Sequence, residues 1–190
     1  EVKQMHINTV TVIGANGTMG RNISGIFASF GNCKVYMVCR TLEKAIAAKN
    51  KAALSVKAEA IEQNLIPCDY SSFEKLVSES DLVFDSIVED MEKKIELNMR
   101  IAKAAKSDTI ICTGTSGLSI QTLSEVLKPE QRKQYIGLHM FNPPYNLTLC
   151  EIIPTKNTSP DVLKALKEYA SIVLHRTVVE VKDYPAFLGN

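Results

Sequence analysis

The feature that most constrains the fold is a run of three glycines at three-residue intervals, placed where an apolar run meets a helical pattern. The segment Gly14-Ala15-Asn16-Gly17-Thr18-Met19-Gly20 follows the strand-like residues 10–13 and opens a helical stretch at residues 19–30. A strand, a glycine turn and a helix in this order begin a βαβ unit. Glycines let the backbone turn sharply and approach a pyrophosphate, which the helix N-terminus would hold. The loop therefore predicts a dinucleotide-binding fold.

The spacing of this loop, G-x-x-G-x-x-G, has one residue more than the usual fingerprint G-x-G-x-x-G. Asn16 then has to fit a crowded turn, and asparagine tolerates left-handed dihedral angles better than most residues. The residues expected at the cofactor are Gly14, Asn16, Gly17, Thr18, Met19 and Gly20. A glycine turn that serves packing alone is the alternative, and the strand–turn–helix context argues against it.

Strand and helix patterns alternate along nearly the whole chain. Strands are expected at residues 10–13, 35–38, 65–68, 82–87, 109–113, 135–140, 147–153 and 177–181, and helices at 19–30, 42–63, 73–77, 91–105, 120–127 (stopped by Pro129) and 161–174. Parallel neighbours need helical crossovers, so this alternation predicts an α/β fold. We expect a Rossmann-like, doubly wound, mostly parallel sheet with a final antiparallel strand pair. Ligands then bind at the carboxyl ends of the strands.

The bulk composition indicates a globular domain that handles a small molecule. The 190 residues are 45% apolar and 23% charged, and the net charge of +1 gives no attraction for nucleic acid or an anionic membrane. No apolar run could span a membrane, and the first residues do not resemble a signal peptide, which favours a cytoplasmic, unsecreted protein. The cysteines form no CxxC pair and are odd in number, so we expect reduced thiols and no metal site.

The second expected strand ends in Cys39-Arg40-Thr41, where dinucleotide-binding folds normally carry a carboxylate for the ribose hydroxyls. A carboxylate would repel a 2′-phosphate, whereas the Arg40 guanidinium and the Thr41 hydroxyl could bind one. This favours NADP over NAD. That Arg40 only stacks on adenine or faces solvent is an equally open interpretation.

A histidine and a carboxylate are predicted to face each other near the end of the sheet. His139 lies at the end of an expected strand, and if the following turn centres near Tyr145, residue 139 lies opposite Glu151. A carboxylate that orients an imidazole makes a general base, which could remove a hydroxyl proton while hydride leaves the same carbon. The pair suits alcohol oxidation, and a structural histidine beside a solvated glutamate is the alternative.

Together these motifs resemble the 3-hydroxyacyl-CoA dehydrogenase family over nearly the whole chain. The segments that carry the resemblance occur in the family's order: VTVIGANGTMG, DLVFDSIVED, TGTSGLSI, GLHMFNPP, LCEII and DYPAFLGN. The segment HMFNPP followed by Glu151 is the most specific, because many dehydrogenases share the glycine loop. The resemblance implies an oxidoreductase of fatty acid metabolism that transfers hydride reversibly between the 3-hydroxyl of an acyl-CoA and NAD.

The resemblance also implies catalytic roles for individual residues. His139 would be the base and Glu151 its partner. Ser116 and Asn190 would hydrogen-bond the substrate's 3-oxygen and its thioester end. Taken singly, Ser116 could be an ordinary loop serine.

On the cofactor side, Glu89 and Lys94 fall where the family contacts the ribose and nicotinamide. Asn142 would help to hold His139 and the nicotinamide side. The alternatives are a helix cap for Glu89, a solvated helix face for Lys94 and a turn former for Asn142.

The chain departs from the family pattern in four ways: the longer glycine loop, the missing ribose carboxylate, Gly114 in place of the usual Asn, and a shorter helical excursion after Arg40. The shorter excursion would weaken the grip on CoA. A non-catalytic nucleotide-binding module, or an NADP-dependent dehydrogenase of another hydroxy acid, therefore stays open.

We expect an NAD(P)-binding Rossmann domain over residues 1–183, with residues 184–190 beginning the link to a C-terminal helical domain that this sequence lacks. In the family that domain closes the acyl pocket and forms the dimer. The full-length protein would then be a homodimer, and the chain alone would be weakly active or inactive because an open half-site leaves the reaction wet and poorly positioned.

Overall fold

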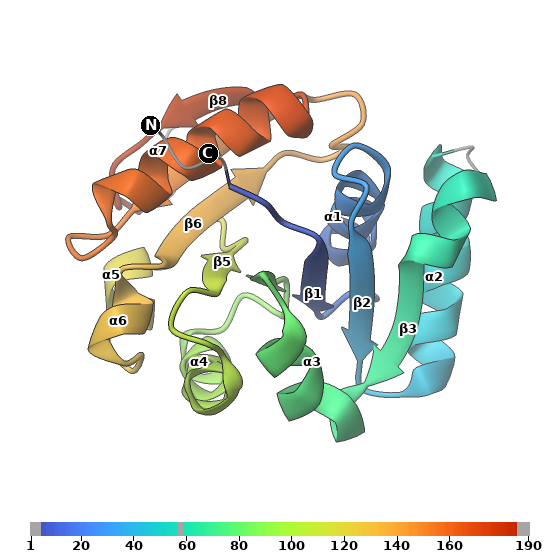
Figure 1. The fold of residues 1–190 in the computed structure, drawn as a ribbon, viewed down its shortest axis with the longest axis horizontal. Coiled ribbons are helices and arrows are strands. Elements are labelled where there is room, and N and C mark those ends of the chain that lie inside the picture. The colour runs from blue at the N-terminus through green and yellow to red at the C-terminus, as the bar shows by residue number, and fades with distance from the viewer. Residues whose placement is uncertain (1–4, 57–58, 186–190) are drawn as a thin grey trace.

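The computed structural model describes residues 5–56 and 59–185, which form an eight-stranded sheet with helices on both faces (Figure 1). The strands are β1 (Thr9–Ile13), β2 (Lys34–Cys39), β3 (Leu65–Asp69), β4 (Leu82–Asp85), β5 (Ile110–Thr113), β6 (Tyr135–Met140), β7 (Leu149–Pro154) and β8 (Thr177–Glu180). Their order across the sheet is β3-β2-β1-β4-β5-β6-β7-β8. All neighbours are parallel except β6 and β7, which pair antiparallel. The predicted fold class is confirmed, and β8 extends the sheet beyond the antiparallel pair.

The helices are α1 (Thr18–Ser29), α2 (Leu42–Val56), α3 (Phe73–Glu79), α4 (Met91–Ala104), α5 (Ile120–Ser124), α6 (Pro129–Arg132) and α7 (Pro160–Glu168). Apolar side chains of α1, α2 and α7 pack on one face of the sheet, and those of α3, α4 and α5 on the other. Burial on both faces explains why strands such as β6 are buried along their whole length. Within the described part of the chain, no helix combines the length and apolar character that crossing a membrane requires.

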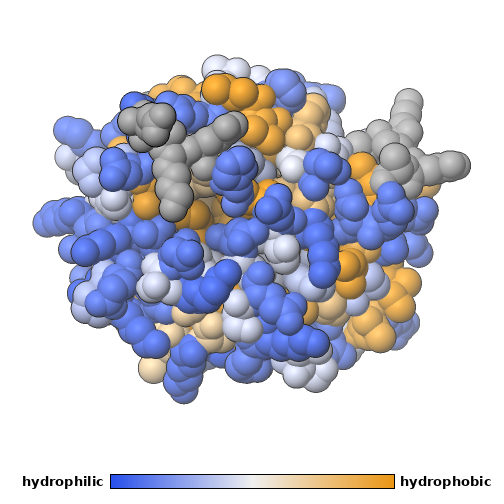
Figure 2. Space-filling view, viewed as in Figure 1, coloured by the Kyte–Doolittle hydropathy of each residue, from blue (hydrophilic) through white to orange (hydrophobic). Residues whose placement is uncertain are grey.

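The outer face of the molecule is mainly hydrophilic, as Figure 2 shows for the view of Figure 1. Apolar groups gather toward the α2 side and over the end of α7 and β8. Exposed apolar residues in these regions include Leu42, Ile46 and Ile172.

Several element boundaries differ from the prediction. The helix expected at residues 42–63 ends at Val56, and a 3₁₀ helix follows at Glu59–Asn64. Pro129 was expected to stop a helix, but it also begins α6. Proline is tolerated there because an N–H in the first turn of a helix has no helical acceptor. The last helix changes into a π-helical turn at Tyr169–Val173.

The start of α4 is fixed by a local cap. The carboxylate of Asp90 accepts a hydrogen bond of 3.0 Å from the backbone amide of Lys93. Glu92 in the first turn and Lys103 in the last complement the helix dipole. These contacts set the first turn of α4 beside the loop that follows β4.

Candidate cofactor and active site

The glycine loop turns directly after β1 and needs glycine at its first position. Gly14 has a φ of +79°, and a Cβ there would lie 2.6 Å from the carbonyl oxygen of Ser86. The amide of Gly14 donates to the carbonyl of Val38 at 3.0 Å, which ties the loop to β2. Asn16 is exposed and does not take the left-handed conformation for which the sequence suggested it, because Gly14 takes that conformation instead.

Gly17 differs from Gly14 because the fold itself does not require a glycine there. It is the N-cap of α1, in an extended conformation with no side-chain cap. A Cβ at Gly17 would meet the carbonyl oxygen of Gly14 at 3.6 Å, an ordinary van der Waals contact. Because Gly17 has no side chain, the backbone amides at the start of α1 stay accessible, and a phosphate group could accept hydrogen bonds from them.

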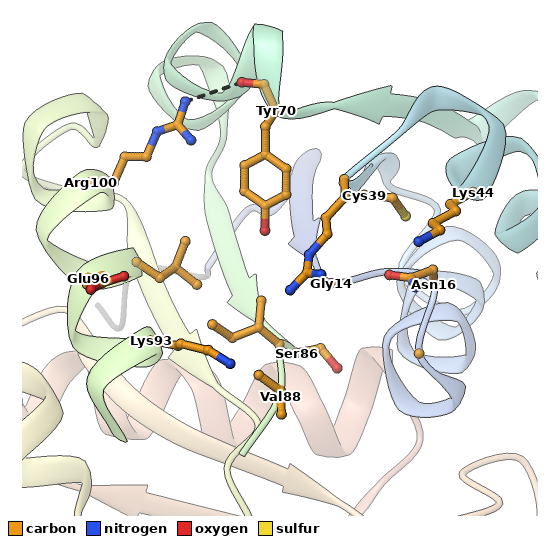
Figure 3. Close-up of a pocket in the computed structure, with 14 residues that line it drawn as sticks. Gly14, Asn16, Cys39, Lys44, Tyr70, Ser86, Val88, Lys93, Glu96 and Arg100 are labelled. Carbon is orange, nitrogen blue, oxygen red and sulfur yellow. Dashed lines mark hydrogen bonds between the residues drawn. The ribbon is translucent and has the colours of Figure 1, made fainter. Parts of the chain in front are cut away.

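A pocket of about 480 Å³ opens between the glycine loop, the end of β2 and α4 (Figure 3). Its lining residues are Gly14, Asn16, Gly17, Cys39, Arg40, Lys44, Tyr70, Ser86, Ile87, Val88, Lys93, Glu96, Leu97 and Arg100. The charged side chains among them are four cations and one carboxylate, that of Glu96. An excess of positive charge beside free backbone donors suits an anionic ligand such as a dinucleotide.

One wall of this pocket is aromatic. Tyr70 directs its hydroxyl into the pocket (Figure 3), and its ring stacks on Phe73 with centroids 5.9 Å apart. The guanidinium of Arg100 lies 4.3 Å from the Phe73 ring centroid and donates to Glu74 at 2.6 and 3.2 Å. Burial raises the pKa of Tyr70, and this effect outweighs the positive charge of Arg40, which lowers it. The hydroxyl of Tyr70 therefore stays protonated. The wall offers a ring face and a hydrogen-bond donor.

Arg40 leaves the end of β2 as an exposed side chain lining the pocket. The hydroxyl of Thr41 accepts a hydrogen bond of 3.3 Å from the amide of Lys44, and Lys44 also lines the pocket. At the end of the neighbouring strand β3, the carboxylate of Asp69 accepts from the amide and hydroxyl of Ser71 at 2.9 and 2.5 Å. Among the described residues, the one carboxylate that lines the pocket is that of Glu96 on α4, and the end of β2 contributes none.

Lys94, predicted at the cofactor, is buried beneath the loop that follows β4. Its ammonium donates to both carboxylate oxygens of Asp85 at 2.9 and 3.1 Å and to the carbonyl of Ile87 at 3.3 Å. Only 1% of the Lys94 side chain is exposed, so the alternative of a solvated helix face is wrong. Lys94 does not line the pocket, whereas its neighbour Lys93 does.

Glu89 joins the loops that follow β4 and β5. Its carboxylate accepts hydrogen bonds from the hydroxyl of Thr115 and, at 3.1 Å, from the amide of Ser116. Ser116 is exposed at this edge of the sheet. Glu89 does not cap α4, since Asp90 has that role. The contact brings two predicted site residues, Glu89 and Ser116, together.

His139 and Glu151 lie directly opposite each other in the β6–β7 pair, as the turn geometry predicted. Nδ1 of His139 lies 3.4 Å from Oε1 of Glu151, and the two residues are 6% and 1% exposed. The ring of Phe141 packs against the imidazole with centroids 4.7 Å apart. The solvated-glutamate alternative is therefore wrong. A buried carboxylate in this position orients the imidazole.

The remaining predicted residues lie outside this pair and the pocket. Thr18 and Met19 begin α1, and Asn142 is exposed after β6. Asn190 lies outside the described residues. Asp183, in the last motif, accepts from the amides that begin α5 at 2.8 and 2.9 Å, so this motif is tied beside the loop that carries Ser116.

The pocket residues that sequence reasoning missed include Tyr70, Ser86, Lys93 and Arg100. Tyr70 and Ser86 each follow the last residue of a strand directly, and that position is itself a signal because ligands gather at carboxyl ends. Lys93 and Arg100 are seven residues apart and share one face of α4. The expected strand ends and the expected helix could therefore have pointed to these four residues.

No cluster of His, Cys, Asp and Glu side chains in residues 5–56 and 59–185 could hold a metal ion. All five cysteines are free thiols, and four of them are buried. Burial raises the pKa of Cys150 to about 12, so this thiol stays protonated at neutral pH.

A doubly wound sheet with a glycine loop, a cationic pocket and a buried His–Glu pair at its carboxyl edge defines a nucleotide-binding oxidoreductase domain. Residues 9–184 match the model of the family described as 3-hydroxyacyl-CoA dehydrogenase, NAD binding domain. The chain belongs to the 3-hydroxyacyl-CoA dehydrogenase family and corresponds to its NAD-binding domain. The predicted family is confirmed.

Individual relatives agree with this assignment. The chain is 33% identical over 203 residues to the mitochondrial hydroxyacyl-coenzyme A dehydrogenase of Sus scrofa, covering 99% of this chain and 63% of that protein. It is 30% identical over 200 residues to a probable 3-hydroxyacyl-CoA dehydrogenase of Deinococcus radiodurans, covering 98% and 56%. The crystal structure of (S)-3-hydroxybutyryl-CoA dehydrogenase from Ralstonia eutropha superposes with a TM-score of 0.85 at 27% identity, covering 97% and 66%. The chain thus spans less than two thirds of these relatives.

Gly114, where the resemblance to the family implied an asparagine, lies against a buried ring. A Cβ at Gly114 would lie 2.8 Å from the ring of Phe84, which is fully buried in β4. A larger residue would have to displace that ring.

Proposed function

We propose that this chain is the cofactor-binding and base-bearing part of an enzyme that transfers hydride between the 3-hydroxyl of an acyl-CoA and a nicotinamide cofactor. The observation that carries the proposal is the buried His139–Glu151 pair, on the same sheet edge as a cationic pocket. The family match supports the cofactor, and the names of the relatives support the acyl-CoA.

In the oxidative direction, His139 removes the proton of the 3-hydroxyl. Because Nδ1 faces Glu151, the ring nitrogen that takes this proton is Nε2. Glu151 holds the ring in place and stabilises the positive charge that the imidazole gains. A bound nicotinamide ring supplies the acceptor for the hydride that leaves the same carbon. In the reductive direction, His139 returns the proton to the 3-oxygen.

The other predicted residues position the two reactants. Ser116 would hydrogen-bond the 3-oxygen and Asn190 the thioester end, while Glu89 would contact the cofactor ribose. Asn142 would hold the nicotinamide side. The contact between Glu89 and the loop of Ser116 supports this arrangement, because it joins a cofactor loop to a substrate loop.

The test is NADH-dependent reduction of acetoacetyl-CoA by the protein that contains this chain, with His139→Asn as the variant. Loss of a general base lowers kcat by about 100- to 10,000-fold, and NADH affinity should stay unchanged. Full turnover in His139→Asn would reject the base assignment. NADH binding without turnover of any 3-ketoacyl-CoA would favour a non-catalytic module, and turnover of a free 3-hydroxy acid alone would favour a dehydrogenase of another acid.

We also propose that Arg40 lets the pocket accept NADP(H) as well as NAD(H), the cofactor that the family match supports. Arg40 and Lys44 line the pocket at the end of β2, and the carboxylate of Asp69 nearby is engaged by Ser71. A guanidinium and an ammonium favour a 2′-phosphate over two ribose hydroxyls. Titration with NADH and NADPH tests this, and Arg40→Ala should weaken NADPH binding about tenfold. Unchanged NADPH binding in that variant would instead make Arg40 an adenine or solvent contact.

For the whole protein we propose a cytoplasmic homodimer with an acyl-CoA substrate. The resemblance to the family supports the dimer. Sedimentation of the protein that contains this chain tests it, and a monomer at micromolar concentration would contradict it.

A further inference from the structure

We propose that Arg176 and Tyr145 are positioning residues of the reaction: they fasten the turn between β6 and β7 to the rest of the domain and so hold the base in place relative to the cofactor. This turn, residues 141–148, joins the strand of His139 to the strand of Glu151. The proposal rests on the proposed function, because it requires His139 to act beside a cofactor held by the glycine loop.

Arg176 is a buried cation whose printed hydrogen bonds go to backbone carbonyl groups. The residue is 5% exposed. Its Nε donates to the carbonyl of Leu174 at 2.8 Å, and its Nη1 donates to the carbonyl of Pro144 in the turn. The guanidinium also lies 5.6 Å from the centre of the Phe30 ring. No ion pair among the described residues includes Arg176. Burying a charge without a counter-charge is unfavourable, so stability alone does not account for a guanidinium at this position.

The segment that carries Arg176 holds the turn at a second place. The amide of Thr177 donates to the carbonyl of Thr148 at 2.9 Å, and the hydroxyls of these two residues lie 3.1 Å apart. The amide of Arg176 itself donates to the carbonyl of Ala170 at 2.8 Å, which ties the segment to the end of the last helix. The turn is therefore attached to this segment both at its middle and at its end.

Tyr145 attaches the same turn to the helix that follows the glycine loop. Its hydroxyl donates to the carbonyl of Asn22, near the start of α1, at 3.3 Å. Figure 1 shows the chain after β6 passing beside α1. Burial raises the pKa of Tyr145 to about 12, so the hydroxyl keeps its proton at neutral pH and can donate it to this hydrogen bond. Because the N-cap of α1 is Gly17, the contact joins the base side of the site to its cofactor side.

The turn acts on the base through its first residue, Phe141. The Phe141 ring packs against the imidazole of His139 with centroids 4.7 Å apart, while Glu151 faces Nδ1 from β7. Asn142, expected at the nicotinamide side, is the next residue of the turn. Misplacing reacting groups by about 1 Å can lower a rate about 100-fold. Loosening the turn should therefore slow the hydride transfer.

Cofactor binding should not depend on the two contacts. The glycine loop is fixed independently of the turn, because the amide of Gly14 donates to the carbonyl of Val38 on β2. No residue of the turn lines the cofactor pocket. Variants that release the turn should thus lower kcat and leave the Kd for NADH unchanged, a combination that a general loss of stability would not produce.

Arg132 provides a matched control for Arg176. It also donates to two backbone carbonyls, those of Leu127 at 3.0 Å and Glu125 at 2.6 Å. It ends α6, which leads into the amino end of β6, at the opposite edge of the sheet from the site. Arg132→Met and Arg176→Met should both lower Tm by about 2 °C or more, but only the second should affect the reaction.

The first experiment is NADH-dependent reduction of acetoacetyl-CoA by the protein that contains this chain. Arg176→Met should lower kcat about 10- to 100-fold, and Arg132→Met should leave it unchanged. Tyr145→Phe keeps the ring and removes one donor, so kcat should fall about threefold. Arg176→Lys keeps the charge with fewer donors and should recover part of the lost kcat. If Arg176→Met does not fold, Arg176→Lys and Tyr145→Phe carry the test.

The second experiment needs neither cofactor nor turnover. The ring current of Phe141 shifts the proton resonances of the His139 imidazole, and the chain has three histidines, so their NMR signals can be assigned. Arg176→Met and Tyr145→Phe should each move the signals of His139 and leave those of His6 in place.

The proposal is overturned if Arg176→Met and Tyr145→Phe keep the wild-type kcat, or if Arg132→Met lowers kcat as much as Arg176→Met does. It is also overturned if the His139 signals do not move, or if NADH affinity falls together with kcat. A wild-type protein that binds no NADH and reduces no 3-ketoacyl-CoA would instead reject the proposed function. The NMR signals would still show, in that case, whether the two contacts hold the turn.

Discussion

The two ends of the carboxyl edge are built in different ways. At the β1–β4 end, the cofactor pocket is lined by exposed charged side chains, and its shape comes from the backbone of the glycine loop and the loop at Ile87. At the β6–β7 end, His139 and Glu151 are buried, and strand register alone sets them face to face. The pocket should therefore be sensitive to backbone changes and tolerant of many side-chain changes. The buried pair should instead be sensitive to changes of its two side chains and tolerant of small backbone changes.

The cause of this difference is the direction of the strands. Parallel strands end together and continue into separate loops, which leave a crevice between them. Antiparallel neighbours place side chains directly across from each other, about 5 Å apart at Cβ. A hydrogen-bonded catalytic pair is more easily built in the second arrangement, and a site for a long cofactor in the first.

The largest effect is expected from Gly14→Ala, which strains the backbone at the pocket end. A positive φ and contact with the Ser86 carbonyl should together lower the free energy of unfolding by about 2–5 kcal/mol. Chemical denaturation measures this loss. A variant as stable as the wild type would show that the loop backbone does not set the shape of the pocket.

Next in size is Glu151→Gln, a change of side chain with nearly the same shape at the buried end. The neutral amide cannot stabilise a protonated His139, so kcat for acetoacetyl-CoA reduction should fall about 100-fold. Cofactor binding, measured by NADH fluorescence, should stay the same because the pocket lies at the other end of the edge. Unchanged kcat would make Glu151 a purely structural partner.

Gly17→Ala should produce a smaller effect, of the opposite kind to Gly14→Ala. The added methyl meets no close contact within the protein, so stability should change by less than about 1 kcal/mol. The methyl group would occupy the approach to the α1 amides, and NADH should bind about tenfold more weakly, or about 1.4 kcal/mol. If stability falls and affinity does not, Gly17 serves packing and the phosphate interpretation is wrong.

The smallest effect is expected from Glu74→Gln, an exposed charge beside the pocket. The hydrogen bond from Arg100 holds the pKa of Glu74 below its ordinary value of 4.5. The ion pair therefore stabilises the fold at neutral pH, and this contribution is lost as the pH falls through the lowered pKa. The variant should be less stable by under about 1 kcal/mol at neutral pH and equal to the wild type in acid. A difference that grows in acid would contradict this assignment.

Much of the edge could be predicted because its signals are local. Glycine spacing after an apolar run marks the first turn, and a turn centred near Tyr145 puts residue 139 opposite residue 151. The positions of Arg40 and Glu89 follow from the ends of β2 and β4. Each of these inferences needs only neighbours in the chain or one short turn.

Other features depend on segments far apart in the sequence. The pairing of Lys94 with Asp85 on β4, which Thr113 on β5 also contacts, cannot be read from any pattern within α4. The aromatic wall requires Arg100 to reach Glu74 on α3, across a separation of 26 residues.

The sequence by itself thus determined the class of fold, the family, the place of the glycine loop and the pairing of His139 with Glu151. Hydrophobic periodicity and turn residues carry that information, because both act within a few residues. Only the tertiary structure decided which buried group pairs with the ammonium of Lys94. That choice depends on the buried carboxylate of Asp85, and packing between β4 and α4 decides where that carboxylate finds its counter-charge.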